Sequence, residues 1–252
     1  MDTFLFYPAG TSDSCHFAAQ VLNQAGFPLT DHPTPEITHL LLDVPSFDGN
    51  GFRKDGSDLR ELLRMLPKAV TVIGGFLIQP CLADYKKIDL LEDPFYLAQN
   101  AAITAECALR AAAPYLKTTF ADSPTLILGW GRIGKCLAKL LRALGCPVTV
   151  AARKEQDRAM LTALGYCAVD FRQVPKALNN CRILFNTVPD VPLHKDVLDA
   201  WKTGIAIDLA SLPGMQGMSV IPARGLPGKY APESSGRLIA KSILRFRQEG
   251  CL

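Results

Sequence analysis

Residues 125–134 have the sequence TLILGWGRIG, and this stretch decides the fold. Four apolar residues of strand length come first, and three glycines then follow at the spacing GxGxxG. After the glycines, apolar residues recur on one face of a helix, at Ile133, Leu137, Leu140, Leu141 and Leu144. A strand, a glycine turn and a helix in this order predict a Rossmann dinucleotide-binding unit.

Each glycine of this turn has its own physical reason. Gly129 permits the tight turn, and Gly131 lets a pyrophosphate approach the backbone N–H groups at the helix N-terminus. Gly134 allows the helix to pack against the strand. A glycine turn that binds nothing is the alternative, which the two flanking elements disfavour. We therefore expect the dinucleotide to be bound by Gly129, Gly131, Arg132, Ile133 and Gly134.

The next expected strand, residues 148–152, ends beside two cations. An NAD enzyme usually has an acid there that accepts both ribose hydroxyls, whereas this chain has Arg153 and Lys154. A carboxylate would repel a 2′-phosphate, and a guanidinium can hold it with two hydrogen bonds. The sequence therefore predicts NADP as the cofactor. The alternative for Arg153 is a solvated surface charge without a ligand.

Strand-length apolar runs alternate with helical patterns along almost the whole chain, which predicts an α/β fold with parallel sheets. The turn after the first strand, residues 8–12, has a single glycine, so we expect no pyrophosphate on the N-terminal part. Residues 225–228 are expected to form a glycine and proline-rich turn. The expected organisation is an N-terminal flavodoxin-like or Rossmann-like lobe for substrate or partner (1–92), a long linking helix (93–118), a doubly wound Rossmann NADP domain (119–230), and a C-terminal helix that returns to the first lobe (231–252).

The composition excludes several classes of partner. With 252 residues, 48% hydrophobic and 20% charged, the chain can bury a full core. Its net charge of +3 comes without a basic stripe, so we expect a small-molecule ligand and neither nucleic acid nor a membrane. The N-terminus lacks the basic region of a signal peptide, and we expect a cytoplasmic protein, with homo-oligomerisation left open.

The eight cysteines form no CxxC pair and no cluster with histidine at metal-ligand spacing. We therefore expect no metal site and mostly buried thiols. A nucleophilic Cys107 is a minor alternative, because a buried thiol is the commoner case.

Several further segments, in this order and spacing, resemble the A-subunit family of dipicolinate synthase. Asn100, Thr104 and Glu106 belong to this similarity, as do the glycine turn and the Ala-Ala-Arg sequence that ends at Arg153. The similarity spans about residues 95–245. Its other segments are NTVP at 186–189, IDLASLPG at 207–214, GLPGKYAP at 225–232 and SG at 235–236.

The resemblance implies an NADP-dependent oxidoreductase that acts with a flavoprotein-like second subunit and forms dipicolinate from a hydroxylated tetrahydrodipicolinate during sporulation. A related small carboxylated substrate is equally open. The turn at residues 9–12 lacks the family's Gly-Asp-x-Arg, and Ile103, Cys107 and Leu212 replace a proline, a glycine and an arginine of the family. Two lost arginines weaken recognition of a dicarboxylate. The second hypothesis is therefore an NADPH-sensing or docking subunit without its own turnover.

In an oxidoreductase of this kind, the protein must hold the substrate carbon against the nicotinamide and handle one proton. Asn100 and Thr104, four residues apart, can share one helical face, and Glu106 joins them only if the helix begins late, near Ile103. Otherwise Glu106 is explained as an acid of the first helical turn that complements the helix dipole. The candidate catalytic residues are Asn100, Thr104, Glu106 and Ser211.

Ligands of parallel sheets bind at the carboxyl ends of the strands. We therefore expect Thr187, Val188, Pro189 and Ala210 to contact the nicotinamide ribose, with ordinary loop residues as the alternative. A D-2-hydroxyacid dehydrogenase needs a histidine after the cofactor domain, and no histidine follows His194. We do not expect that activity, and we expect an exposed His194.

Overall fold

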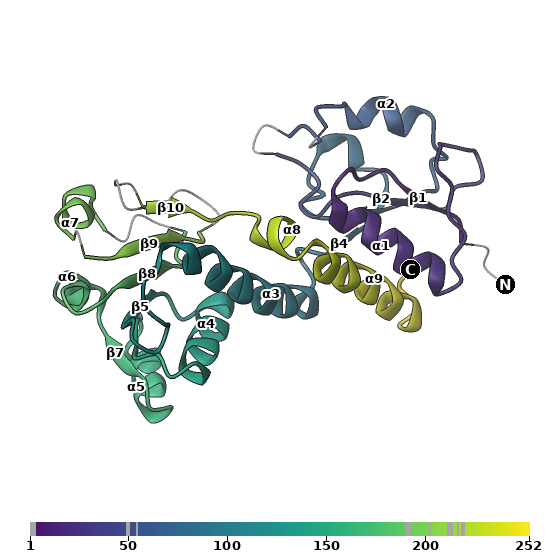
Figure 1. Ribbon diagram of the computed structural model, residues 1–252. Helices are drawn as coiled ribbons and strands as arrows, with labels where there is room; N and C mark the ends of the chain where they lie inside the picture. Colours follow the sequence, from purple (N-terminus) through teal and green to yellow (C-terminus); the bar gives the residue numbers. More distant parts are fainter. Residues whose placement is uncertain are drawn as a thin grey trace. The chain divides into compact units, whose positions relative to one another are not determined.

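The computed structural model describes residues 4–48, 51–53, 55–189, 193–201, 203–210, 214, 215, 217 and 220–252. It contains two parallel sheets with helices packed against them (Figure 1). The chain divides into a first unit, Met1–Asn100 with Pro227–Leu252, and a second unit, Ala101–Leu226. The predicted α/β fold with two lobes is confirmed. The boundary between the units falls inside helix α3 (Pro94–Ala112), which a short 3₁₀ turn η2 (Ala113–Tyr115) follows.

The second unit is a Rossmann domain. Its six strands are parallel and lie in the order β10-β9-β8-β5-β6-β7, which is the doubly wound order 3-2-1-4-5-6 read from the other edge. The three-residue strand β10 was not predicted, because it is short and ends at a proline. The elements are β5 (Thr125–Leu128), α4 (Arg132–Ala143), β6 (Val148–Ala151), α5 (Glu155–Ala163), β7 (Cys167–Val169), η3 (Phe171–Gln173), α6 (Val174–Leu178), β8 (Ile183–Asn186), α7 (Lys195–Ala200), β9 (Ile205–Asp208) and β10 (Val220–Pro222).

The first unit has a smaller parallel sheet in the order β1-β2-β3-β4. Leu29 forms an isolated parallel bridge with Phe6 in β1. With this segment counted as the second strand in chain order, the order becomes 2-1-3-4-5, as in flavodoxin-like folds. The elements are β1 (Phe6–Pro8), α1 (Asp13–Gln24), β2 (His39–Leu41), α2 (Leu59–Arg64), β3 (Thr71–Gly74), η1 (Pro80–Leu82) and β4 (Lys86–Asp89).

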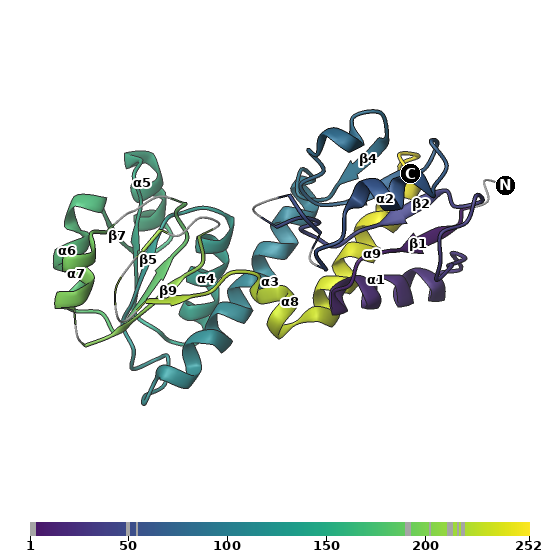
Figure 2. The same ribbon diagram turned by 90° about the horizontal axis from the view of Figure 1, so that it is seen from above.

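The C-terminal helix α9 (Pro232–Gln248) lies along α1 within the first unit, as both ribbon views show (Figures 1 and 2). A side chain at Gly236 would place its Cβ 2.6 Å from the carbonyl oxygen of Ser14 and 2.8 Å from the backbone nitrogen of Ala18. The two helices therefore approach through their backbones. Helix α8 (Leu226–Tyr230) precedes α9 and includes residues 226–228. The prediction of a turn at residues 225–228 is therefore wrong. A proline in the first turn of a helix is well tolerated.

The Asp93 carboxylate connects the start of α3 to α9. It accepts hydrogen bonds from the backbone N–H groups of Phe95 and Tyr96, at 3.2 and 3.1 Å, and so caps α3. The Arg245 guanidinium of α9 donates to the same carboxylate at 2.6 Å. Arg245 also lies 5.1 Å from the centre of the Phe95 ring. One buried acid therefore fixes both the start of α3 and the position of α9.

His39, in β2, is a buried histidine within an aromatic cluster. Its ring stacks on Phe6 with centroids 4.7 Å apart, and its Nδ1 lies 2.8 Å from the Thr38 hydroxyl. Its Nε2 has no hydrogen-bond partner among the described residues. Burial, together with the charge of Lys86, lowers the pKa of His39 from 6.5 to about 4.

We expect His39 to make the protein sensitive to acid. Below pH 6.5 the unfolded chain binds a proton at this residue, whereas the folded protein stays neutral there until the pH approaches 4. Stability should therefore fall by about 2 to 3 kcal/mol between pH 7 and pH 4 on account of His39. Urea unfolding of the wild type and His39→Phe at several pH values measures this. Equal pH dependence in the two proteins would contradict it.

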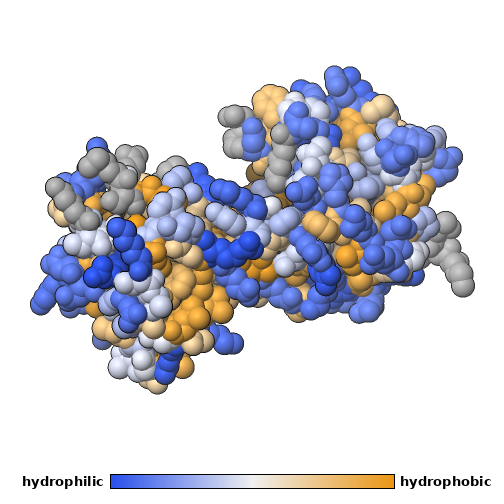
Figure 3. All heavy atoms as spheres, viewed as in Figure 1, coloured by the Kyte–Doolittle hydropathy of each residue, from blue (hydrophilic) through white to orange (hydrophobic). Residues whose placement is uncertain are grey.

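No helix among the described residues is long and apolar enough to cross a membrane. Hydrophilic and hydrophobic residues are mixed over the molecular face in Figure 3.

Candidate functional site

The glycine turn lies between β5 and α4 in the second unit. Gly129 has φ +101°, and a Cβ there would lie 2.6 Å from Thr187 Oγ1. A Cβ at Gly134 would collide with the carbonyl oxygen of Gly129. The fold itself therefore requires glycine at both positions, one for the turn and one for the close packing of α4.

Gly131 is different, because nothing in the fold requires it to be glycine. Its φ and ψ of −80° and −170° are extended backbone that any residue adopts, and a Cβ there would meet no atom within 4 Å. Gly131 is exposed at the N-cap of α4, and no side chain of the described residues caps this helix end. The N–H groups at this helix end therefore have no side-chain acceptor among the described residues.

The electrostatics of this helix end favour an anion. The first turn of α4 has no acidic residue, and its first residue is Arg132. A cation is disfavoured by the helix dipole there unless an anion lies nearby. Lys135, one turn later, has its Nζ 5.8 Å from the centre of the Trp130 ring, which also contacts Tyr166 at 5.9 Å. Trp130 therefore lies inside the candidate phosphate turn with its ring partly exposed.

The structure brings the ends of β5 and β8 together, because the two strands are neighbours in the sheet. The Thr187 hydroxyl donates to the carbonyl oxygen of Leu128 at 2.7 Å, and the Thr187 backbone N–H donates to the same oxygen at 3.0 Å. Val188 donates its N–H to Asn186 Oδ1 at 3.0 Å, and Pro189 is exposed. The loop after β8 therefore lies directly beside the glycine turn.

Asn186 and Asp208 organise this edge of the sheet, and the sequence did not assign them a role. The buried Asn186 side chain donates to Asp208 Oδ1 at 2.9 Å. The Asp208 carboxylate also accepts backbone N–H groups from Ala210 at 3.3 Å, Gly214 at 3.0 Å and Met215 at 3.3 Å. The sequence did contain a signal for this pair, because Asn186 and Asp208 are each the polar last residue of an apolar strand. Ser211 lies outside the described residues.

Three cationic side chains lie around the end of β6: Arg153, Lys154 and Arg158. Arg153 and Lys154 are both exposed, which fits a phosphate contact and a solvated surface charge equally. Arg158 of α5 donates its Nη1 to the carbonyl oxygens of Ala152 and Arg153, at 2.8 Å each. Sequence spacing gave no signal for Arg158, because its partners are backbone atoms.

Helix α3 begins at Pro94, so the condition under which Asn100, Thr104 and Glu106 would meet does not hold. Thr104 is buried, Asn100 is half-buried and Glu106 is exposed. Two residues along a helix correspond to about 200°, which turns Glu106 away from Thr104. The three side chains therefore do not share one face of α3, and the catalytic roles of Asn100, Thr104 and Glu106 stay predictions.

Cys107 and His194 behave as ordinary structural residues. Burial raises the pKa of the Cys107 thiol, which disfavours the reactive thiolate and with it the nucleophile alternative. His194 is exposed at the N-cap of α7, as expected. Within the described residues, no three histidine, cysteine, aspartate or glutamate side chains form a metal-binding group.

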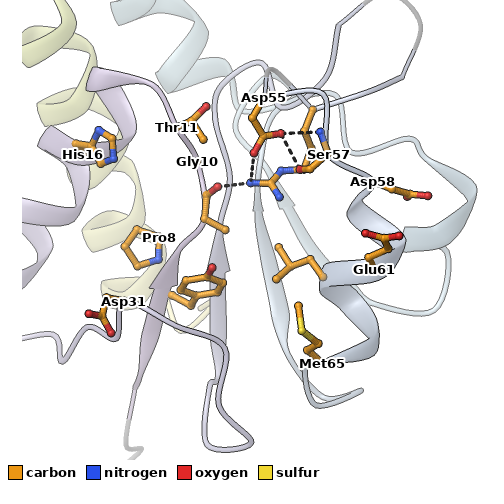
Figure 4. A pocket seen from close by; sticks show the side chains of 14 residues that line it. Pro8, Gly10, Thr11, His16, Asp31, Asp55, Ser57, Asp58, Glu61 and Met65 are labelled. Atoms are coloured by element: carbon orange, nitrogen blue, oxygen red, sulfur yellow. Dashed lines mark hydrogen bonds and ion pairs between the residues drawn. The ribbon is translucent and has the colours of Figure 1, made fainter.

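The first unit has its own cavity of about 500 Å³, next to the turn after β1 (Figure 4). Asp58, Glu61 and Met65 from the α2 segment form one wall, and Pro8 and Gly10 lie across from them. The remaining lining residues are Tyr7, Ala9, Thr11, His16, Asp31, Arg53, Asp55, Ser57 and Leu62.

A carboxylate of the protein itself accepts hydrogen bonds from the backbone N–H groups of this turn. Asp43 accepts the backbone N–H groups of Thr11 at 3.1 Å and of Ser12 at 3.0 Å, and also the Ser12 hydroxyl. Asp43 is buried, at 5% exposure. The turn therefore already holds an anion, in keeping with the expectation that no pyrophosphate binds on this lobe.

Arg53 is the arginine of this cavity. Its side chain is 12% exposed, donates to the carbonyl oxygen of Ala9 and lies 3.4 Å from Asp55. Asp55 in turn accepts the Ser57 hydroxyl at 2.7 Å. With Asp31, Asp58 and Glu61 also in the lining, acidic groups outnumber basic ones. A dianionic ligand is electrostatically disfavoured in this cavity.

Comparison with known proteins agrees with the geometry of the second unit. Residues 98–202 match the family described as D-isomer specific 2-hydroxyacid dehydrogenase, NAD binding domain. This match indicates a nicotinamide dinucleotide as the cofactor and does not distinguish NAD from NADP. It concerns the cofactor domain alone.

The chain also resembles the A-subunit of dipicolinate synthase, as its sequence predicted. It is 30% identical to that protein of Bacillus subtilis (strain 168) over 177 residues, which are 66% of this chain and 59% of the relative. The match thus spans less than two thirds of this curated relative.

The crystal structures of the dipicolinate synthase A-subunits from Bacillus halodurans and from Bacillus subtilis share the fold. Both have a TM-score of 0.82, with 21% and 22% identity, and the matches cover 97% and 99% of this chain and 98% and 97% of theirs.

Proposed function

We propose that the protein is an NADP-dependent oxidoreductase related to the dipicolinate synthase A-subunit, acting on a small carboxylated compound. The observation that carries the proposal is Gly131, an exposed glycine that the fold does not need, at an uncapped helix N-terminus with Arg132 beside it. The nicotinamide, when bound, supplies hydride chemistry. The residues proposed to hold the cofactor are Gly129, Gly131, Arg132, Ile133, Gly134, Arg153, Lys154, Thr187, Val188, Pro189 and Ala210.

The preference for NADP rests on the end of β6. Arg153, Lys154 and Arg158 gather there, with Glu155 and Asp157 in the first turn of α5. No carboxylate takes the place at which NAD enzymes bind the ribose hydroxyls. Arg158 is paired with Asp170, so Arg153 and Lys154 are the two cations proposed to meet a 2′-phosphate.

We expect NADPH to bind more tightly than NADH. Trp130 lies inside the glycine turn, so quenching of its fluorescence reports binding of either dinucleotide. Arg153→Ala should weaken NADPH binding by about tenfold or more, the loss of one charge-assisted contact, and should change NADH binding little. If the wild type binds NADPH and NADH with equal affinity, Arg153 gives no support for NADP as the cofactor.

The substrate proposal rests on Arg53 and on the family. Arg53 is positioned beside the turn in which the family has an arginine, but a substrate carboxylate would have to compete there with Asp55, so the family resemblance is the stronger support. The specific proposal is the formation of dipicolinate from a hydroxylated tetrahydrodipicolinate in sporulation, together with a flavoprotein-like second subunit. The residues proposed for substrate binding and proton handling are Asn100, Thr104, Glu106 and Ser211.

The acidic lining of the first-unit cavity favours a second candidate, an NADPH-sensing or docking subunit without its own turnover. Such a protein would bind the dinucleotide as described above but would not transfer hydride to or from it. Stopped-flow absorbance at the nicotinamide band, with the hydroxylated tetrahydrodipicolinate and NADP, separates the two candidates. Any stoichiometric reduction of NADP excludes the sensor.

A further inference from the structure

The Arg158 side chain holds the turn that carries Arg153 and Lys154. It comes from the first turns of α5, and its Nη1 is shared by the carbonyl oxygens of Ala152 and Arg153, at 2.8 Å each. Only 25% of the side chain is exposed. Both carbonyls follow directly after β6, where the strand has left them without a partner from the sheet ladder.

These two carbonyls matter for a neighbouring phosphate. A carbonyl oxygen and a 2′-phosphate are both hydrogen-bond acceptors, so they repel each other when close. A guanidinium that donates to the carbonyls neutralises them and fixes the backbone from which Arg153 projects. Hydrogen bonds from a charged donor are stronger than those between neutral groups, and two of them on adjacent carbonyls fix the path of this short turn.

Asp170 opposes the charge of Arg158. Its Oδ2 lies 3.1 Å from Arg158 Nη1, and its Oδ1 accepts the backbone N–H of Arg172 at 3.0 Å. The backbone N–H of Asp170 donates to Gln173 Oε1 at 2.9 Å, which completes a capping box at the start of η3. The carboxylate is therefore held in place beside the guanidinium, and it cancels part of the positive charge there.

We infer that Arg158 is a positioning residue that sets the preference for a 2′-phosphorylated dinucleotide, and that Asp170 limits this preference. The inference rests on the proposed NADP function. Arg158 acts through the turn at residues 152–154, and the pair of opposite charges tunes the local potential.

The pair predicts changes of opposite sign, which a purely structural role does not. Arg158→Met should weaken NADPH binding by about tenfold and leave NADH binding within about twofold, because NADH has no 2′-phosphate to repel. Asp170→Asn should tighten NADPH binding by about threefold to tenfold, because the amide oxygen still caps η3 while the negative charge is gone. Arg158→Lys should fall between the wild type and Arg158→Met, since an ammonium cannot reproduce the planar fork.

The experiment is a titration of Trp130 fluorescence with NADPH and NADH for the wild type and the three variants, each with its melting temperature. Arg153→Ala serves as the reference for loss of a direct contact. If Arg158→Met and Asp170→Asn each weaken the binding of NADPH and of NADH, the inference is overturned and the two residues have a purely structural role. The ratio of NADPH affinity to NADH affinity could stay unchanged in Arg158→Met and Asp170→Asn but fall in Arg153→Ala. That result would overturn this inference and leave the NADP proposal standing. A wild type without preference for NADPH overturns the NADP proposal as well.

Discussion

Gly131→Val should abolish dinucleotide binding without unfolding the protein. The variant side chain would project from an exposed position where a Cβ meets no protein atom within 4 Å, and the backbone there is extended. It would occupy the space in front of the α4 N-terminus and keep a pyrophosphate from the backbone N–H groups. The loss of two or more charge-assisted hydrogen bonds corresponds to at least about 100-fold in NADPH affinity. Tryptophan quenching and a thermal melt measure the two effects separately.

Gly129→Val is the matched control at the other end of the same turn. It places a side chain on a residue with φ +101° and against Thr187 Oγ1, so it should lower the melting temperature as well as binding. The pair therefore distinguishes a glycine required by the fold from one required by a ligand. If Gly131→Val binds NADPH like the wild type, this turn is not the pyrophosphate site.

Asp93→Ala should destabilise the first unit by about 2 to 4 kcal/mol. The change removes the cap of α3 and leaves the partly buried Arg245 guanidinium without this carboxylate. Urea unfolding followed by far-UV circular dichroism gives the free energy of unfolding. The cofactor turn lies in the other unit, so NADPH affinity should stay near the wild-type value while the protein is folded.

Glu233→Ala is the matched control on α9. Glu233 pairs with Arg237 at 2.6 Å, and both side chains are largely exposed, so its loss should cost less than about 1 kcal/mol. A similar loss of stability in the two variants would show that Asp93 contributes no more than a surface ion pair.

The Rossmann unit could be predicted from sequence because its signals are local. A glycine turn lies between an apolar strand and a helical stripe within twenty residues, and each signal depends only on neighbours in the chain. The Asp93-Pro94 pair was also a local signal, an N-cap acid before a proline, that places the start of α3 early and separates Glu106 from Thr104.

What the sequence could not provide are contacts between distant segments. Asn186 and Asp208 meet only because β8 and β9 are paired in the sheet. Arg158 binds carbonyl oxygens, and every residue has one, so no residue type marks its partners. Strand β10 has only three residues and ends at a proline, so it is too short to show a period.

The carboxylate of Asp43 has a consequence for competition between ligands. As part of the same chain, Asp43 competes for the N–H groups of Thr11 and Ser12 at an effective concentration that is high for a tethered group. A free phosphate at cellular concentration must displace it and also expose a buried charge. Among the described residues, the turn after β1 has a carboxylate of the chain bound to its N–H groups, whereas the N-terminus of α4 has no side-chain cap. We therefore expect a titration with NADPH to show one bound dinucleotide per chain.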